Sequence, residues 1–548
     1  MHTPIQRNYV AVLFFIALVS RYVWPATVPD QFYLGTNFSG ISDWGTEPIW
    51  KDYMKQSRTW CPQRPGDAWG NGWPLAVDSL NWITGLDADQ TADSPLFGAT
   101  SDNWTSMHPD TTYYVLYDGE GTIELSDAES YQTVSPGKIE FKAKPSSAPF
   151  LQITATSPDD YIRNIRVVSA GNEASYESDP WVPEFLERWL PFPVIRFMDW
   201  GSTNDSPIRY WSERTRPNAQ TQAMPGGVAL EYMIDYCNRT LSEPWFCMPH
   251  MADDDYIRRF ATMVRDNLDT RLKIYVEYSN EVWNSIFEQT HYCDSVGSAQ
   301  GLDPSDTHPW EAGWRYSGRR SKQIFKIWEE VFGNTDRIVR VIASQMNTYV
   351  TERKLETDSV YKYTDAVAIA PYFGGAYNDA DRMEEIAAWT VDQLLDSCLK
   401  DIRGNIRNEI EAHVNLCKQY NTDYGTDLKL IAYEGGQHLT AWNTNQAATD
   451  LFTAANRSPR MKDLYITYFE MWDTLGGTLF AQFSSLCSPG PYGAWCVLEN
   501  VDQDPATAPK YQALLELIAA HPAPGRASVH RSVSQRDYYE SGSSRFLR

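Results

Sequence analysis

Two glutamates lie at or near the ends of apolar segments and could act together in catalysis. Glu281 ends the segment 273–281, and Glu434 lies close to the end of the segment 428–436. A protonated carboxyl can donate a proton to a leaving group, and an ionised carboxylate can attack as a nucleophile. A single glutamate after an apolar strand more often caps a helix or forms a salt bridge. Two of them in equivalent positions, one directly preceded by Asn280, favour catalysis by the pair.

The elements that would position these glutamates form a repeating pattern along the chain. Short apolar and β-branched segments alternate with stretches of helical periodicity, which is typical of a parallel sheet covered by helices. There are eight such segments, and this number favours an α/β fold of the (β/α)8 TIM barrel type over an open, doubly wound sheet. The eight segments are 33–39, 193–200, 243–250, 273–281, 337–345, 365–373, 428–436 and 477–485.

Polar residues gather at the ends of these eight segments. In barrels of this type the active site lies at the carboxyl ends of the strands, so residues from different segments meet at one mouth. Besides the two glutamates, the candidates are Arg196, Asp199, His250, Asn280 and Tyr372.

Two motifs resemble those of the clan A retaining glycoside hydrolases, which include cellulases, mannanases and β-glucosidases. They are YSNEVWN at 278–284 and AYEGG at 432–436, on the fourth and seventh predicted strands. The resemblance implies that Glu281 is the acid/base and Glu434 the nucleophile, with the two carboxyls about 5–5.5 Å apart. The whole chain is also similar to bacterial secreted proteins described as glycosidases or cellulose-binding proteins.

The resemblance also implies roles for the supporting residues. Asn280 would bind the sugar 2-hydroxyl, His250 would lie beside the sugar, and Arg196 and Tyr372 would hold Glu434. An adjacent arginine lowers the pKa of a carboxylate, whereas burial and a second negative charge raise that of the proton donor. Because neighbouring residues of a strand point to opposite faces, Asn280 and Glu281 can both reach the site only if the strand ends or bulges there.

The eighth segment departs from the clan's pattern. The clan commonly has a tryptophan there as a platform for the sugar, whereas this chain has Phe480, Gln482 and Phe483. Trp495, between Cys487 and Cys496, is the candidate replacement. We expect these two cysteines to form a disulfide, and Cys237 and Cys247 are a second close pair.

The chain divides into five predicted regions. Residues 1–26 contain an apolar block of about ten residues and predict a secretory signal peptide, too short to span a bilayer. Residues 27–110 begin the barrel and are rich in tryptophan, and we expect some of these side chains to line a cleft. Residues 111–170 predict a small antiparallel β module inserted in the first connection, which either binds glycan or shields the barrel. Residues 171–521 complete the barrel, and 522–548 predict a flexible tail.

The composition limits the classes of partner that the chain is expected to bind. The 548 residues carry a formal net charge of −24, which disfavours nucleic acid and anionic membranes. No segment after the signal peptide is long and apolar enough for an integral membrane domain, and no zinc-binding cysteine spacing occurs. Five sequons agree with secretion into a glycosylating compartment, at Asn37, Asn103, Asn204, Asn238 and Asn456.

These observations predict a secreted, extracellular retaining glycoside hydrolase that cleaves β-glycosidic bonds in a neutral polysaccharide or oligosaccharide, without metal or cofactor. The main alternative is a glycan-binding protein with the same barrel, in which the carboxylates do not catalyse hydrolysis. A metal-dependent hydrolase that uses His250 and Asp253 ranks last. The sequence leaves open the sugar, the linkage and the choice between endo and exo attack.

Overall fold

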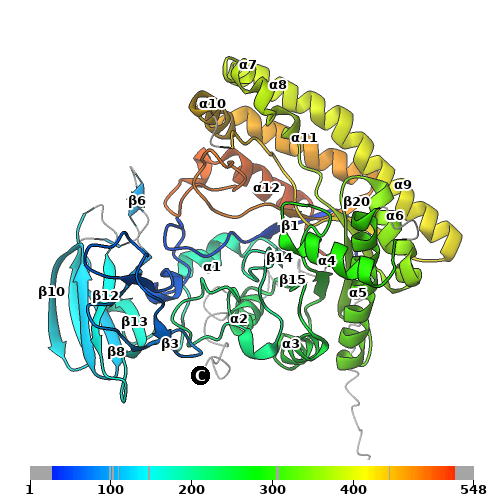
Figure 1. Ribbon diagram of the computed structural model, residues 1–548. Coiled ribbons are helices and arrows are strands. Elements are labelled where there is room, and N and C mark those ends of the chain that lie inside the picture. Colours follow the sequence, from blue (N-terminus) through cyan, green and yellow to red (C-terminus); the bar gives the residue numbers. More distant parts are fainter. Residues whose placement is uncertain are drawn as a thin grey trace, which may run out of the picture.

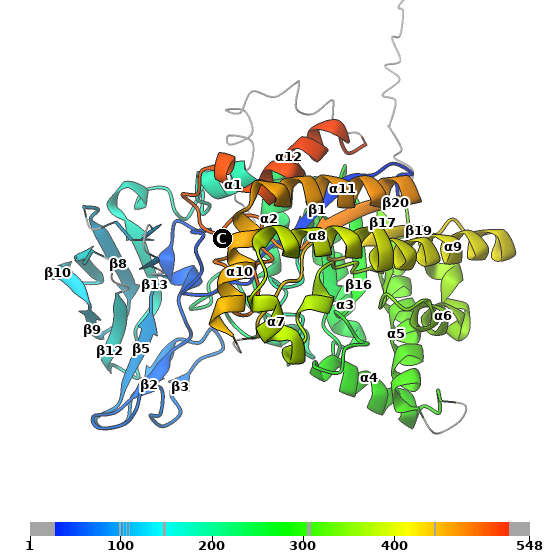
Figure 2. The same cartoon turned by 90° about the horizontal axis from the view of Figure 1, so that it is seen from above.

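The centre of the molecule is a closed barrel of eight parallel strands (Figures 1 and 2). The structure, a computed structural model, describes residues 28–97, 100–101, 104–105, 107–108, 110–145, 149–303, 308–442 and 445–524. In barrel order the strands are β1 (Tyr33–Asn37), β14 (Val194–Arg196), β15 (Glu243–Met248), β16 (Ile274–Tyr278), β17 (Ile338–Ala343), β18 (Ala366–Ile369), β19 (Lys429–Ala432) and β20 (Gly477–Gln482). Each lies in one of the eight predicted segments, so the predicted (β/α)8 barrel is confirmed.

Helices surround the barrel, and some of them pack on other helices rather than on the strands. They are α1 (Pro183–Trp189), α2 (Leu230–Thr240), α3 (Asp254–Asn267), α4 (Glu288–Ala299), α5 (Pro309–Phe332), α6 (Thr348–Glu356), α7 (Met383–Ala387), α8 (Val391–Asp401), α9 (Arg407–Tyr424), α10 (Gln446–Arg457), α11 (Pro459–Leu475) and α12 (Pro509–Ala520). In α3 the buried side chains include Tyr256, Phe260 and Val264 at helical spacing, and the Asp253 side chain caps the helix by accepting from the Tyr256 N–H.

The barrel interior is filled by alternate strand residues, as the period of two requires. Near its amino-terminal end the hydroxyls of Tyr33 and Tyr275 lie 2.7 Å apart across the interior. Trp245, Val339 and Leu479 belong to the same buried cluster, and the intervening residues of each strand pack against the helices. The filled interior leaves polar side chains of different strands to meet at the carboxyl-terminal mouth.

A β module lies beside the barrel, to the left in Figure 1, and consists of two four-stranded antiparallel sheets. One sheet contains β10 (Ala128–Ser135), β11 (Lys138–Ala143), β8 (Tyr113–Asp118) and β13 (Arg163–Ser169). The other contains β2 (Cys61–Gln63), β5 (Thr91–Pro95), β12 (Phe150–Thr156) and β9 (Gly121–Ser126). Their facing apolar side chains form a core of their own. A turn at 118–121 leads from β8 in one sheet to β9 in the other.

The module begins further upstream than the predicted boundary at residue 111. Strands β2 and β5 precede that boundary, and β5 pairs with β12 inside the module. Trp60 and Trp82 are buried in the module core, because the tryptophan-rich segment supplies much of its apolar surface. Trp82 and Trp50 also border a cavity beside the module, in line with the expectation that some of these side chains line a cleft. Three other tryptophans of the segment are exposed, namely Trp44, Trp69 and Trp73.

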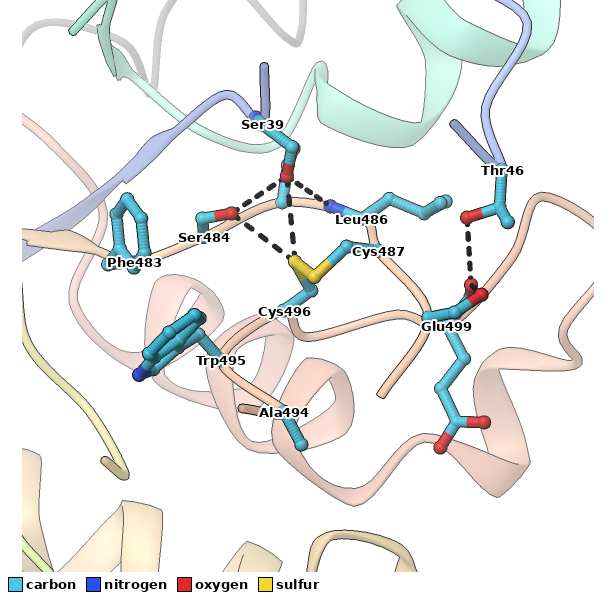
Figure 3. Close-up of a disulfide and its surroundings, with 12 residues drawn as sticks. Ser39, Thr46, Phe483, Ser484, Leu486, Cys487, Ala494, Trp495, Cys496 and Glu499 are labelled. Atoms are coloured by element: carbon cyan, nitrogen blue, oxygen red, sulfur yellow. Dashed lines mark hydrogen bonds between the residues drawn. A yellow bond between two sulfur atoms is a disulfide. The ribbon is translucent and has the colours of Figure 1, made fainter. Parts of the chain in front are cut away.

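Cysteine pairing agrees with one expectation and corrects the other. Cys487 and Cys496 form a disulfide, with their Cα atoms 5.4 Å apart (Figure 3). The suggested pair Cys237 and Cys247 does not form, and both are buried free thiols. Cys237 lies on α2 and Cys247 on β15, where its thiol donates to the Glu277 carboxylate at 3.5 Å.

Burial also corrects the prediction of glycan attachment at two sequons. Asn37 and Asn456 are 1 % and 6 % exposed, so neither amide is accessible in the folded chain. Asn103, the predicted signal peptide at 1–26 and residues 525–548 of the predicted tail lie outside the described residues. The tail prediction began too early, since the Pro522 carbonyl accepts from the Gln31 amide at 3.0 Å and Ala523 packs against the barrel interior cluster. Of the helices that the structure describes, none is long and apolar enough to cross a membrane.

Candidate active site

Four of the eight barrel strands, β14, β16, β18 and β19, bring the predicted site residues together at the barrel mouth. Arg196 is the last residue of β14, and Glu281 follows the end of β16 by three positions. Tyr372 follows β18, and Glu434 follows β19. The carboxyl ends of these parallel strands share one end of the barrel, so residues far apart in sequence become neighbours.

Arg196 is the centre of the site's hydrogen-bond network. Its guanidinium is fully buried, and Nη1 donates to Oε1 of Glu434 at 2.8 Å and to Oδ1 of Asn37 at 3.1 Å. Nε and Nη2 donate to the two carboxylate oxygens of Glu277 at 3.0 and 3.1 Å, and Nη2 also donates to Oδ1 of Asn280 at 2.8 Å. A planar guanidinium has fixed donor directions, so this network sets the positions of its partners.

Glu434 is held on its other side by Tyr372, whose hydroxyl donates to Oε2 at 2.9 Å. The glycines that follow Glu434 allow the chain to turn closely there. Gly435 and Gly436 have φ of +154° and +119°, and a Cβ on Gly435 would lie 2.4 Å from the Phe480 ring. The glycine pair in the AYEGG motif is therefore required by backbone conformation and by space.

Glu281 lies where the backbone of β16 leaves the strand conformation. The strand ends at Tyr278, and Ser279 and Glu281 have φ of 56° and 41°. This break lets Asn280 contact Arg196 while Glu281 reaches Tyr433, which follows β19. Oε1 of Glu281 accepts from the Tyr433 hydroxyl at 3.1 Å. Its other oxygen, Oε2, accepts from the side-chain amide of Asn284 at 2.9 Å.

Asn280 is oriented by further amides. Its Nδ2 donates to Oδ1 of Asn204 at 3.0 Å, and Nε2 of Gln289 donates to the same oxygen at 2.8 Å. Nε2 of Gln289 also lies 2.9 Å from the Asn280 carbonyl, to which it donates. Asn204 was considered above only as a sequon, but its amide oxygen supports Asn280 at the barrel mouth.

The two glutamates differ in the groups that surround them. Burial raises the pKa of Glu434 to about 8; Arg196 and the Tyr372 hydroxyl oppose this shift, and the charge of Glu281 adds to it. Burial also raises the pKa of Glu281, whereas the hydrogen bonds that it accepts from the neutral side chains of Asn284 and Tyr433 lower it. Because the charge of Glu281 raises the pKa of Glu434, the two carboxyls titrate as an interacting pair. We assign the negative charge to Glu434, because it alone of the pair is bonded to the guanidinium.

His250 lies at the mouth end of β15 but makes no hydrogen bond through its ring with the site residues that the structure describes. The side chain is buried, its ring packs edge-on against Tyr292 at 5.2 Å, and its Nδ1 has no partner in the described part of the chain. Burial lowers its pKa to about 4, so the ring is neutral at pH 7. Asp253, the other residue of the metal hypothesis, is the cap of α3. Within the described ranges no three His, Cys, Asp or Glu side chains group as metal ligands.

An aromatic cluster continues from Tyr372 to Trp495. The centroid of the Tyr372 ring lies 5.0 Å from that of His438 and 6.4 Å from that of Phe483. The centroids of these two rings lie 5.6 and 6.0 Å from that of Trp495. Figure 3 shows Phe483 and Trp495 side by side next to the disulfide. The Lys510 ammonium donates to the Trp495 carbonyl at 3.0 Å and ties the loop to α12. His438 and Phe483 thus link Trp495 to Tyr372, which is the residue of this cluster that bonds Glu434.

Sequence reasoning missed several residues that build this site. Glu277, buried in β16, pairs with Arg196 and accepts from the Trp245 indole at 2.8 Å. Asn37 bonds Arg196, and Tyr433 bonds Glu281. Of these residues, Glu277 could have been recognised in the sequence, because a charged residue within the apolar strand IYVEY is unusual.

Several solved structures are distantly similar to this chain. An arabinose-bound α-L-arabinofuranosidase of family GH51 has a TM-score of 0.46 and 10% identity, over 90% of this chain and 80% of that one. A GH5 xyloglucan-specific endo-β-1,4-glucanase from a metagenomic library, in complex with cellotriose, has a TM-score of 0.32 and 13% identity, over 65% of this chain and 91% of that one. A Thermotoga maritima β-glucosidase in complex with castanospermine has a TM-score of 0.31 and 11% identity, over 60% of this chain and 83% of that one.

Glycoside hydrolases of clan A are among the structures to which this chain is similar. No family model and no curated protein sequence matches the chain.

Proposed function

We propose that this protein is a retaining glycoside hydrolase in which Glu434 is the nucleophile and Glu281 the acid/base. The observation that carries the proposal is the bond between the buried Arg196 guanidinium and Glu434, at 2.8 Å, which is absent for Glu281 among the described contacts. It gives the two carboxyls the unequal environments that the reaction needs.

The reaction would proceed in two displacements. The protonated carboxyl of Glu281 gives its proton to the glycosidic oxygen as that bond breaks, and the Glu434 carboxylate attacks the anomeric carbon to form a glycosyl ester. Glu281, now ionised, takes a proton from water as that water attacks the ester and releases Glu434. Arg196 and Tyr372 stabilise the charge on Glu434 before attack and after release. Asn280, held by Asn204 and Arg196, would hydrogen-bond the sugar 2-hydroxyl.

For the substrate we propose a neutral β-linked polysaccharide or oligosaccharide. The support is the overall negative charge, which would repel acidic glycans, and the aromatic cluster of Tyr372, Phe483 and Trp495 next to Glu434. Aromatic faces can pack against the C–H faces of sugar rings. His250, uncharged and buried beside the mouth, suits contact with a neutral ligand.

We also propose that the protein is secreted. The support is the apolar block near the amino terminus and the disulfide between Cys487 and Cys496, which persists in an oxidising compartment. The amino-terminal sequence of protein recovered from culture medium tests this proposal. Protein that stays in the cytosol with residues 1–26 attached would contradict it.

The test of the hydrolase proposal begins with a glycan panel read by mass spectrometry and continues with two variants on a cleaved substrate. Glu434→Gln removes the covalent step and should lower turnover by several orders of magnitude with glycan affinity nearly unchanged. Glu281→Ala removes proton donation, worth about 10²–10⁴-fold, and should impair natural substrates far more than activated aryl glycosides. Azide should restore cleavage by Glu281→Ala and give a β-glycosyl azide.

A 2-fluoro glycoside identifies the nucleophile independently, because it slows hydrolysis of the covalent ester. Peptide mapping should find the label on Glu434. A label on another carboxylate, or near-normal turnover by both variants, would refute the assignment. Binding to glycans without release of any product would instead favour a catalytically silent binding protein.

A further inference from the structure

A second cavity lies where the β module meets the barrel, and it shares no residue with the carboxylate site. Its volume is about 290 Å³. The lining comes from four parts of the chain: the segment after β1, strand β13, the segment before α1, and the barrel side at α2. We call it the junction cavity. Small-molecule sites span roughly 300–1,000 Å³, so the junction cavity has room for a small ligand such as one sugar ring.

Four side chains that border the junction cavity have polar atoms with no hydrogen-bond partner among the residues that the structure describes. These atoms are Nε1 of Trp50, Nε1 of Trp82, Oδ2 of Asp52 and Nε of Arg166. Buried polar groups are nearly always hydrogen-bonded, so four exceptions around one cavity require an explanation. A polar ligand or ordered water in the cavity would provide one.

Asp52 shows that this part of the wall is organised. Its Oδ1 accepts the backbone N–H groups of Met54 and Val167, at 3.1 and 2.8 Å, which leaves Oδ2 without a partner. The nearby Lys55 ammonium donates to the carbonyls of Pro217 and Ala219, at 2.7 and 3.2 Å, and thereby connects this wall to the barrel. The polar groups are therefore held in place by the module and by the barrel together.

The charges and rings of the lining indicate the class of ligand. Asp52 and Glu177 supply two negative charges and Lys55 and Arg166 two positive charges, so the lining has no formal net charge. An anionic ligand would meet the two carboxylates, and a cationic one the two basic groups. The rings of Trp50, Trp82, Tyr176 and Tyr232 add apolar surface. Sugar hydroxyls both donate and accept hydrogen bonds, and sugar rings have apolar C–H faces, so a neutral sugar matches this mixture.

We propose that the junction cavity is a second binding site and that its ligand is one unit of a neutral sugar. Such a site would connect the β module to glycan while the carboxylate site acts elsewhere on the molecule. The inference does not depend on hydrolysis, because the cavity and the catalytic pair have no residue in common.

The experiment measures sugar binding by full-length protein with turnover removed by Glu434→Gln. The probes are the methyl glycosides of glucose, xylose, galactose, mannose and arabinose, with glucuronic and galacturonic acids as an acidic arm, studied by saturation-transfer NMR and titration calorimetry. Adding Arg166→Met removes the guanidinium and keeps the aliphatic stem. We expect it to weaken the binding of at least one neutral glycoside about tenfold or more, and to remove one site from the stoichiometry.

Arg163→Met is the matched control, because Arg163 lies on the same strand, is not part of the lining and pairs with Asp160 at 2.6 Å. It should leave binding unchanged. Tyr176→Ala changes a lining residue from another segment of the chain and should reproduce the loss, which keeps the test valid if Arg166→Met does not fold. The proposal is overturned if no neutral glycoside binds in a manner sensitive to Arg166 or Tyr176, as with a cavity that holds water only. Preferential binding of the uronic acids at this position would also overturn it.

Discussion

Replacing Tyr372 by phenylalanine tests which of the two glutamates is the nucleophile. The hydroxyl of Tyr372 donates to Oε2 of Glu434 at 2.9 Å, and this bond favours the ionised carboxylate. Its loss raises the pKa of Glu434. Because the nucleophile must be ionised, the acidic limb of the kcat/KM profile should move to higher pH. The ring of the new phenylalanine can keep the contacts with His438 and Phe483, so the fold should be retained.

The size of the shift follows from the burial of the acceptor. Glu434 is 5 % exposed, so water cannot fully replace the lost donor. A hydrogen bond to a charged group contributes about 1.5–3 kcal/mol. One pKa unit corresponds to about 1.4 kcal/mol, so the acidic limb should move by about 1–2 pH units. The bond from Arg196 to the other oxygen of Glu434 remains and limits the shift.

Tyr433→Phe is the matched control, because Tyr433 donates to Oε1 of Glu281 at 3.1 Å. Its removal raises the pKa of Glu281, which must be protonated in the first step, so the basic limb should move to higher pH instead. The assay is kcat/KM across pH on an aryl glycoside that the parent cleaves, with melting curves to exclude unfolding. Movement of the basic limb alone by Tyr372→Phe would refute the assignment of roles.

Three further predictions concern stability. Arg196→Met should lower the free energy of unfolding by about 3–5 kcal/mol, because it leaves two buried carboxylates without their counter-charge; urea unfolding with no change in midpoint would contradict this. Replacing Cys487 and Cys496 by serine should cost about 2–3 kcal/mol in the same assay, since the disulfide closes a short loop, and unchanged stability would refute this role. Removing residues 525–548 should leave Tm and activity unchanged, because that segment lacks apolar periodicity; calorimetry showing a loss of several degrees would contradict it.

The sequence alone determined the barrel and the identity of its two leading carboxylates. All eight strands lie in segments marked by short apolar runs, because parallel strands buried on both faces leave a local, continuous pattern. Glu281 and Glu434 were found by their positions at the ends of such runs. The disulfide between Cys487 and Cys496 was also predictable, because the two residues are close in sequence.

Only the tertiary structure decided what surrounds those carboxylates. Arg196 and Glu434 are 238 positions apart, and their contact depends on the closure and register of the barrel, which no local pattern encodes. The same closure buries Asn37 beside Arg196 and brings Glu277 into the network. Strand pairing also extended the β module upstream to β2, and its core buried Trp60 and Trp82. Periodicity within a segment reports which face is apolar, whereas contacts between segments depend on how the whole chain packs.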